Sequence, residues 1–217
     1  MGNPRAFSIV LALVAALSAG EVIDRVAVVA GNQVITESEL IRELRTVALL
    51  NGHPVDLSPE AKRQTAERLV EQSFIRREMD VSRYGPPSVA DTEALLQKTK
   101  SESFPTEEAY LEALQKYRIT EEELRQHVQL QLMTLRFIDF RFRPGVQVPL
   151  EDLREYYDER FVPEWQKKSN DPAPPFEETR DDIEQIITEQ RVDQALDRWV
   201  NQQRTQTEIR YQQEAFQ

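Results

Sequence analysis

The chain has 217 residues, carries a formal net charge of −11 and contains no cysteine. The lack of cysteine excludes disulfides, thiolate zinc sites and thiol catalysis. The acidity disfavours binding to nucleic acid or to an anionic membrane. About two hundred residues beyond a leader are enough for one or two compact units.

The first residues, 1–20, predict a cleavable signal peptide. Arg5 supplies positive charge, the segment 6–17 is apolar apart from Ser8, and Ser18-Ala19-Gly20 offers small residues for cleavage. An apolar run of about a dozen residues is too short to span a bilayer, and no cysteine is present for a lipid anchor. We therefore expect an exported protein without stable membrane insertion; a buried core helix is the alternative for this run.

Two β segments lie at opposite ends of the remaining chain. A hairpin is predicted over 26–36, because Gly31-Asn32 separates two runs of β-branched residues and both residues tolerate positive φ. A short strand is predicted over 207–211. Isolated strands are marginal in water, so we expect these ends to pair. The fold class is thus mainly α, with a small sheet formed by the N-terminal hairpin and the C-terminal strand.

The segments between the strands predict helices. Thr36 and Glu39 form a capping box for a first helix to about Leu50, and Ser58-Pro59 begins a second, to about Tyr84. Further helices are predicted over 91–100, from Thr106, from Thr120 to about 142, and after Pro149; a proline-rich connector over 163–175 then precedes a last helix over 176–204.

The helix from Thr120 is apolar on two sides. One side carries Leu124, Val128, Leu132, Leu135, Ile138 and Phe142, and the opposite side carries Ile119, Leu130, Met133, Phe137 and Phe140. Such a helix is either sandwiched inside a core or presents one face to a partner. Both interpretations stay open from the sequence.

The last helix changes its apolar side halfway along. Phe176, Ile183, Ile186 and Ile187 share one side, and Val192, Ala195, Leu196, Trp199 and Val200 share roughly the opposite one. We expect the first half to pack against the helix of Tyr156 and Tyr157, and the second half to pack near the hairpin. A helix buried all round is the alternative.

The sequence contains no motif typical of catalysis. His53 and His127 have no metal-binding spacing, with His53 in a turn and His127 on a charged helix face, and no glycine-rich phosphate loop or Gly-x-Ser-x-Gly motif occurs. Acidic groups such as Glu121–Glu123 stand in a predicted first helical turn, where carboxylates favour the helix dipole. The sequence predicts no catalytic residue, metal site or cofactor.

Two segments carry a recognisable pattern: 22–40, VIDRVAVVAGNQVITESEL, and 119–124, ITEEEL. The first resembles the hairpin that begins SurA-type periplasmic chaperones and their parvulin-linked relatives, and the second resembles a later helix start in those chains. The segment 148–159 resembles the part that precedes the isomerase domain. The segments 176–183, 195–199 and 208–211 resemble the helix and strand that follow it.

The chain departs from the family between these matched parts. The relatives carry parvulin domains there, whereas here a connector over 162–175 is far too short for one. The expected organisation is a signal peptide (1–20) and one SurA-like chaperone domain, SurA/trigger-factor C-terminal-like (21–217), made of an N-terminal part (21–161), the linker (162–175) and a C-terminal helix and strand (176–217). The family's prolyl isomerase activity is therefore not carried over.

The resemblance implies a holdase that binds unfolded exported polypeptides, such as outer-membrane proteins, through apolar surfaces and without nucleotide. The client-contact residues we expect are Met133, Phe137 and Phe140, with Trp165 as a further candidate. A prolyl isomerase-related enzyme and an adaptor for one defined partner are the alternatives. A hairpin at a chain end also suits strand exchange between two copies, which would give a homodimer.

Overall fold

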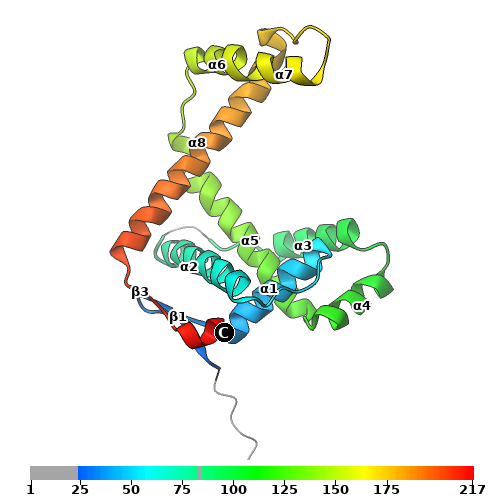
Figure 1. Cartoon of the computed structure of the whole chain (residues 1–217), viewed down its shortest axis with the longest axis vertical. Helices are drawn as coiled ribbons and strands as arrows, with labels where there is room; N and C mark the ends of the chain where they lie inside the picture. The colour runs from blue at the N-terminus through cyan, green and yellow to red at the C-terminus, as the bar shows by residue number, and fades with distance from the viewer. Residues whose placement is uncertain (1–23, 83–84) are drawn as a thin grey trace, which may run out of the picture.

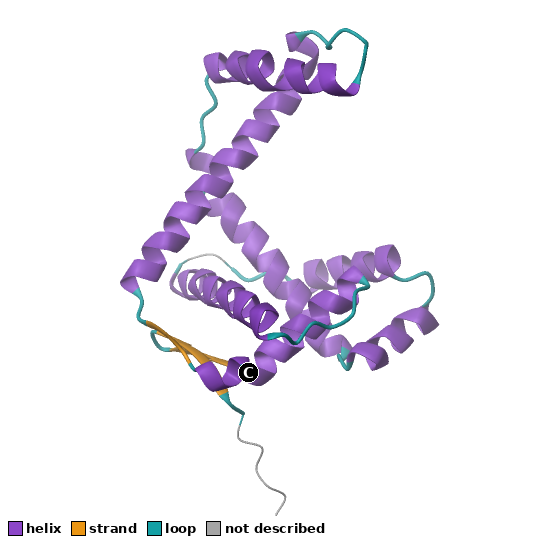
Figure 2. Cartoon of the chain, in the orientation of Figure 1, coloured by secondary structure: helices purple, strands orange, loops and turns teal. Residues whose placement is uncertain are grey.

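The structure, a computed structural model, describes residues 24–82 and 85–217, so the predicted signal peptide lies outside the described residues. Figure 1 and Figure 2 show a mainly helical chain with one small sheet, as predicted. The strands are β1 (Val26–Ala30), β2 (Gln33–Thr36) and β3 (Ile209–Tyr211). The α-helices are α1 (Glu37–Asn51), α2 (Pro59–Val81), α3 (Val89–Ser103), α4 (Glu107–Tyr117), α5 (Glu121–Arg141), α6 (Leu150–Tyr156), α7 (Val162–Lys168) and α8 (Phe176–Gln206).

The two ends of the chain meet in the sheet. The strand order is β2-β1-β3, with both neighbours antiparallel to β1. Val28 pairs with Tyr211 and Ala30 with Ile209. Gly31 lies in the hairpin turn with φ of 61°, and its N–H donates to the Glu208 carbonyl at 2.9 Å. The prediction that head and tail pair in one sheet is confirmed.

Local capping signals place the helix starts where the sequence predicts them. Thr36 and Thr120 each form a capping box, with Glu39 and Glu123 as the reciprocal partners. Ser58 accepts from the Ala61 N–H and Pro59 occupies the first helical turn. The second helix ends at Val81, somewhat earlier than expected.

The sheet, α2, the second half of α5 and the end of α8 share one core. A second core joins α1, α3, α4 and the first half of α5, around Leu96, Tyr110 and Leu124. Helix α5 therefore contributes its two ends to different cores, and part of its length stays exposed, since Leu135 and Phe140 are 58% and 62% exposed. We call residues 24–147 and 188–217 the body.

A separate small core lies at the far end of α8. Leu153, Ile183 and Ile187 are buried there, and partly buried aromatic residues pack around them. We call residues 148–187 the distal lobe; Figure 1 shows α8 running from this lobe to the sheet. Since 31 residues make a helix of about 46 Å, α8 sets the distance between the distal lobe and the body. The predicted change of apolar side along α8 is confirmed, since Ile183 and Ile187 lie in the lobe core and Trp199 in the body core, but Ile186 of the predicted stripe is 37% exposed.

The predicted connector over 162–175 is wrong for its first half. Residues 150–168 form one helical run, in which a π-helical turn, η2 (Tyr157–Phe161), joins α6 to α7. Pro163 lies in the first turn of α7, and the wider π turn before it accommodates the missing N–H. Only the segment 169–175 is non-helical.

Candidate functional site

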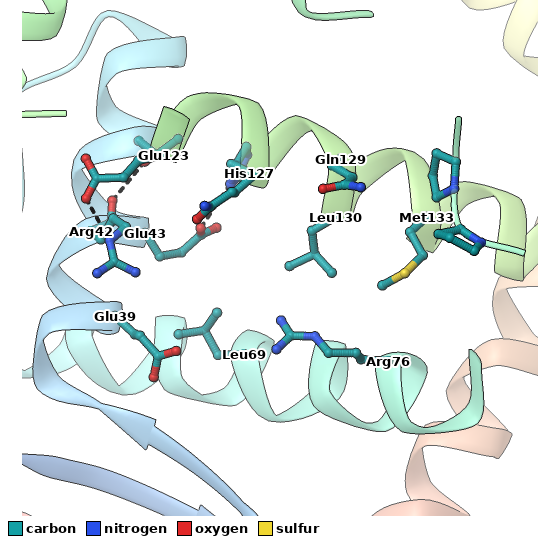
Figure 3. Close-up of a pocket in the computed structure, with 14 residues that line it drawn as sticks. Glu39, Arg42, Glu43, Leu69, Arg76, Glu123, His127, Gln129, Leu130 and Met133 are labelled. Atoms are coloured by element: carbon teal, nitrogen blue, oxygen red, sulfur yellow. Dashed lines mark hydrogen bonds and ion pairs between the residues drawn. The ribbon is translucent and has the colours of Figure 1, made fainter. Parts of the chain in front are cut away.

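A cleft of about 410 Å³ opens between α1, α2 and α5. We call it the central cleft, and Figure 3 shows side chains from the three helices pointing into it. It is lined by Glu39, Arg42, Glu43, Thr46, Leu69, Arg76, Pro86, Pro87, Glu123, Gln126, His127, Gln129, Leu130 and Met133.

The α1 end of the central cleft is polar and internally paired. Arg42 donates to Glu123 at 2.9 Å, and His127 Nδ1 lies 3.0 Å from Glu43. Burial works to raise the pKa of Glu123, but hydrogen bonds from Thr120 and the Arg42 guanidinium outweigh it and hold that pKa below its usual value. This end is held in place by its own contacts.

His127 lies among charged side chains, as predicted, but it is buried there. Its side chain is buried against α1, and Nε2 has no hydrogen-bond partner among the described residues. Leu124 and Val128 on the same stripe are also buried, so the polar imidazole is packed with the core rather than exposed. The pairing with Glu43 satisfies one ring nitrogen and orients the ring.

The other end of the central cleft is apolar and carries one cation. Leu69 on α2 faces Leu130 and Met133 on α5, and Pro86 and Pro87 border this end. In the same cleft, Arg76 is exposed and makes no ion pair with any described residue. Leu69 and Arg76 share a face of α2 because seven residues make nearly two helical turns. This region has the chemistry to accept apolar side chains.

A second pocket, of about 810 Å³, adjoins the central cleft and lies between α2 and α5. We call it the apolar pocket; its lining residues are Met79, Ser82, Gly85, Arg136, Asp139, Phe140 and Pro144. Gly85 borders it while Pro86 and Pro87 border the central cleft, so the segment 85–87 lies between the two. Phe140 is 62% exposed here. Leu135, also on α5, is 58% exposed.

The structure separates the four predicted client-contact residues. Met133 lines the central cleft and Phe140 lines the apolar pocket. Phe137 is corrected to a core residue, because it is 1% exposed and packs edge-on against Phe142 and beside Trp199. Trp165 lies in the distal lobe, where its ring stacks on Phe161 and its Nε1 donates to the Asp171 carbonyl at 3.1 Å.

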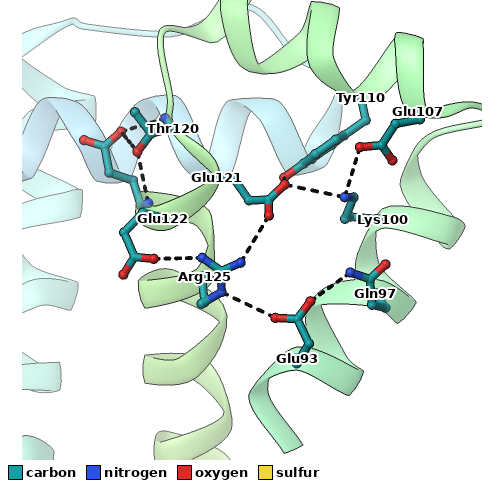
Figure 4. Close-up of polar contacts among 10 residues, drawn as sticks. Glu93, Gln97, Lys100, Glu107, Tyr110, Thr120, Glu121, Glu122 and Arg125 are labelled. Atoms are coloured by element: carbon teal, nitrogen blue, oxygen red, sulfur yellow. Dashed lines mark hydrogen bonds and ion pairs between the residues drawn. The ribbon is translucent and has the colours of Figure 1, made fainter. Parts of the chain in front are cut away.

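A dense polar network lies at the N-terminal end of α5, on the side that faces α3 and α4. Figure 4 shows Arg125 between Glu93, Glu121 and Glu122, at 3.4, 3.1 and 2.7 Å respectively. Tyr110 donates to Glu121 at 3.2 Å, and burial together with this carboxylate raises the pKa of the tyrosine. These carboxylates are occupied by partners within the fold, which fits a structural role.

Within the described ranges, no cluster of histidine or carboxylate side chains is arranged to hold a metal ion. In the same ranges, no helix is both long and apolar enough to cross a bilayer. Comparison with protein-family models and with curated proteins found no match for this chain.

Proposed function

We propose that the protein is a holdase-type chaperone of the SurA-like class, which binds unfolded exported polypeptides without isomerising prolines. The observation that carries the proposal is the pair of adjoining pockets along α2 and α5. Met133 and Leu130 line one, and Phe140 and Met79 line the other. Apolar side chains that line neighbouring surface pockets are typical of a binding surface, and methionine adapts to varied partners.

The architecture supports the same proposal. The sheet that joins the chain ends and the long α8 match what the resemblance to SurA-type chaperones implies for their chaperone domain. Unfolded outer-membrane proteins expose alternating apolar and aromatic side chains. Non-directional apolar contacts in two neighbouring pockets would hold such segments while letting them dissociate. The periplasmic location is part of the proposal and is supported by the predicted leader together with the resemblance.

An aggregation assay tests the proposal. A denatured outer-membrane β-barrel protein is diluted into buffer with and without an excess of the chain, and light scattering is followed. We expect the chain to suppress scattering, and Met133→Gln combined with Phe140→Ser to weaken this, since each lost apolar contact is worth roughly 1–2 kcal/mol. Leu111→Ser is the matched control, because Leu111 is 48% exposed on α4 and lines neither pocket.

The outcomes separate the competing functions. No suppression by the chain, with folding verified by circular dichroism, would contradict a holdase. Suppression that is equal in the double variant and in the chain would move the binding surface away from α2 and α5. A protease-coupled assay on a proline peptide addresses the enzyme alternative: acceleration above background would contradict the absence of isomerase activity. A single stoichiometric complex without protection of unrelated clients would indicate an adaptor.

A further inference from the structure

A third pocket lies where the body meets α8. Its volume is about 550 Å³, and it is formed by the end of α5, the segment 142–147 and the middle of α8. Figure 1 shows α8 passing the end of α5 at this place. We call it the junction pocket; it is lined by Arg141, Phe142, Gly145, Val146, Gln147, Arg191, Gln194, Ala195 and Arg198. Three of these residues are arginines and none is acidic.

The three arginines differ in how they are partnered. Arg191 pairs with Asp152 and donates to the Gln147 carbonyl, so its charge is neutralised and it fixes the segment before α6. The Arg141 guanidinium lies 5.9 Å from the centre of the Phe142 ring. Neither Arg141 nor Arg198 makes an ion pair within the described residues. Two unneutralised guanidinium groups from different helices therefore border one pocket.

The junction pocket gathers positive charge in a chain that is acidic overall, with 38 acidic residues against 27 basic ones. Some arginines of the body, such as Arg42, Arg125 and Arg204, are each paired with glutamate. The junction pocket instead collects cations without a neutralising acid in its lining. The Debye length is about 8 Å at physiological salt, so distant acidic groups are screened while these arginines act locally.

The chemistry of the lining defines the ligand. Planar guanidinium groups bind oxyanions with paired hydrogen bonds, and the amides of Gln147 and Gln194 add donors. Phe142, Val146 and Ala195 add apolar surface beside the cations. A ligand that fits has a carboxylate next to an apolar group, as in a polypeptide segment where acidic and apolar residues alternate.

We propose that the junction pocket binds the carboxylate side chains of a polypeptide client, and so makes the protein prefer clients with acidic residues beside apolar ones. This deepens the holdase function and rests on it for the polypeptide nature of the ligand. Arg141 and Arg198 are the binding residues, and Arg191 is the positioning residue that holds the segment before α6 against α8.

Two labelled peptides test the proposal by fluorescence anisotropy. One alternates phenylalanine with aspartate, and the other carries asparagine in place of each aspartate. We expect the chain to bind the acidic peptide several-fold more tightly and to lose this preference at high salt. Arg141→Gln and Arg198→Gln should each reduce the preference about two- to fivefold, as for exposed charge pairs. The matched control is Arg180→Gln, an exposed arginine of α8 outside the pocket.

The result that overturns the proposal is equal affinity of the chain for both peptides, or a preference that survives in the double arginine variant. Displacement of the acidic peptide by inorganic phosphate, but not by sodium chloride of equal ionic strength, would reassign the pocket to phosphate and likewise overturn it. The holdase function fails separately, in the light-scattering assay. A double variant that still suppresses aggregation of a client but no longer prefers the acidic peptide would support both proposals.

Discussion

The body and the distal lobe are both built from packed helices, yet they are held together differently. In the body, residues from the two ends of the chain pack on each other: Ala27 and Val28 lie in the same core as Ala215 and Phe216. In the distal lobe, the core joins Leu153 with Ile183 and Ile187, which all come from the single continuous segment 148–187. Local contacts open independently more readily than long-range ones, so the body should set the global stability and the lobe should open first.

Polar contacts reinforce the same difference. In the body, Arg204 of α8 pairs with Glu67 and Glu71 of α2, at 2.6 and 3.0 Å. In the lobe, the Tyr157 hydroxyl donates to the Pro174 carbonyl at 2.7 Å, and Arg154 lies over Phe176 at 4.9 Å. The body contacts fix α8 to α2, whereas the lobe contacts only connect neighbouring parts of the lobe. The chain has one tryptophan in each region, so replacing either one leaves a fluorescence signal from the other region alone.

The largest expected effect is that of Trp199→Ala in the body. Trp199 packs against Phe137 and Phe142, with ring centres 5.2 and 6.1 Å apart, and truncation would leave a cavity between α5 and α8. We expect the free energy of unfolding to fall by about 3–5 kcal/mol, measured by urea denaturation and circular dichroism. The control is Trp165→Ala, at the partly exposed tryptophan of the lobe, and this variant should keep its main unfolding transition nearly unchanged. An equal loss of unfolding free energy in the two variants would contradict the comparison.

Lys62→Met should have the next largest effect. The Lys62 ammonium is buried and donates to Glu37 at 3.1 Å and to the carbonyls of Ala215 and Gln217 at 3.1 and 3.0 Å. Removing it takes the donor from the Ala215 and Gln217 oxygens and leaves Glu37 paired with the exposed Arg25 at 3.5 Å, at a cost of about 2–3 kcal/mol. Lys98→Met, at an exposed lysine paired with Glu102 at 3.8 Å, is the control and should change stability little. A neutral result for Lys62→Met would mean that the C-terminal segment does not depend on this contact.

Leu153→Ala should separate the two regions rather than weaken the whole. Leu153 is 2% exposed at the centre of the lobe core, so its truncation removes about 2 kcal/mol from the lobe. We expect faster amide hydrogen exchange over residues 150–187 and an unchanged global transition. Leu150→Ala, at a half-exposed leucine of the same helix, is the control. A lower global unfolding midpoint would show that the lobe and body unfold as one unit.

The sequence predicted the elements whose signals are local. The capping residues Thr36, Ser58 and Thr120 act within one helical turn, so their roles can be read from four consecutive residues. The pairing of β1 with β3 was predicted from a different argument, since two lone strands at the chain ends each need a partner.

The sequence did not predict which apolar positions are covered. Phe137 and Phe140 are three residues apart on one side of α5, yet one is 1% and the other 62% exposed. Periodicity shows that two side chains share a face, but burial depends on which distant segment packs there. The burial of His127 was missed for the same reason, since its partner Glu43 lies on α1. The helical state of residues 162–168 was missed because Pro163 is usually a helix breaker, and the π turn before it has no simple sequence pattern.

The candidate site was only partly predictable. Met133 and Phe140 were predicted from the apolar stripe of α5, but Leu69 and Arg76 come from α2, more than fifty residues earlier in the chain. The junction pocket likewise joins α5 to α8 through Arg141 and Arg198. Sites made from such distant segments depend on how the helices cross, which the spacing of residues within one helix does not reveal.

The smallest expected effect is that of Tyr211→Phe, and it depends on pH. The Tyr211 hydroxyl of β3 donates to Glu67 at 2.8 Å, so its loss should cost about 1 kcal/mol near neutral pH.

Burial and the Glu67 carboxylate raise the pKa of Tyr211 to about 12, whereas an unfolded tyrosine has a pKa of about 10. Between these values the unfolded chain has released a proton that the folded chain keeps, so the stability contributed by Tyr211 falls as pH rises from about 10 to about 12. The advantage of the unmodified chain over Tyr211→Phe in urea denaturation should therefore shrink across this interval. Tyr156→Phe in the lobe, whose hydroxyl has no hydrogen bond within the described residues, is the matched control and should change stability little near neutral pH. A constant difference between the unmodified chain and Tyr211→Phe from neutral to strongly alkaline pH would mean that the Tyr211–Glu67 contact does not fasten β3 to α2.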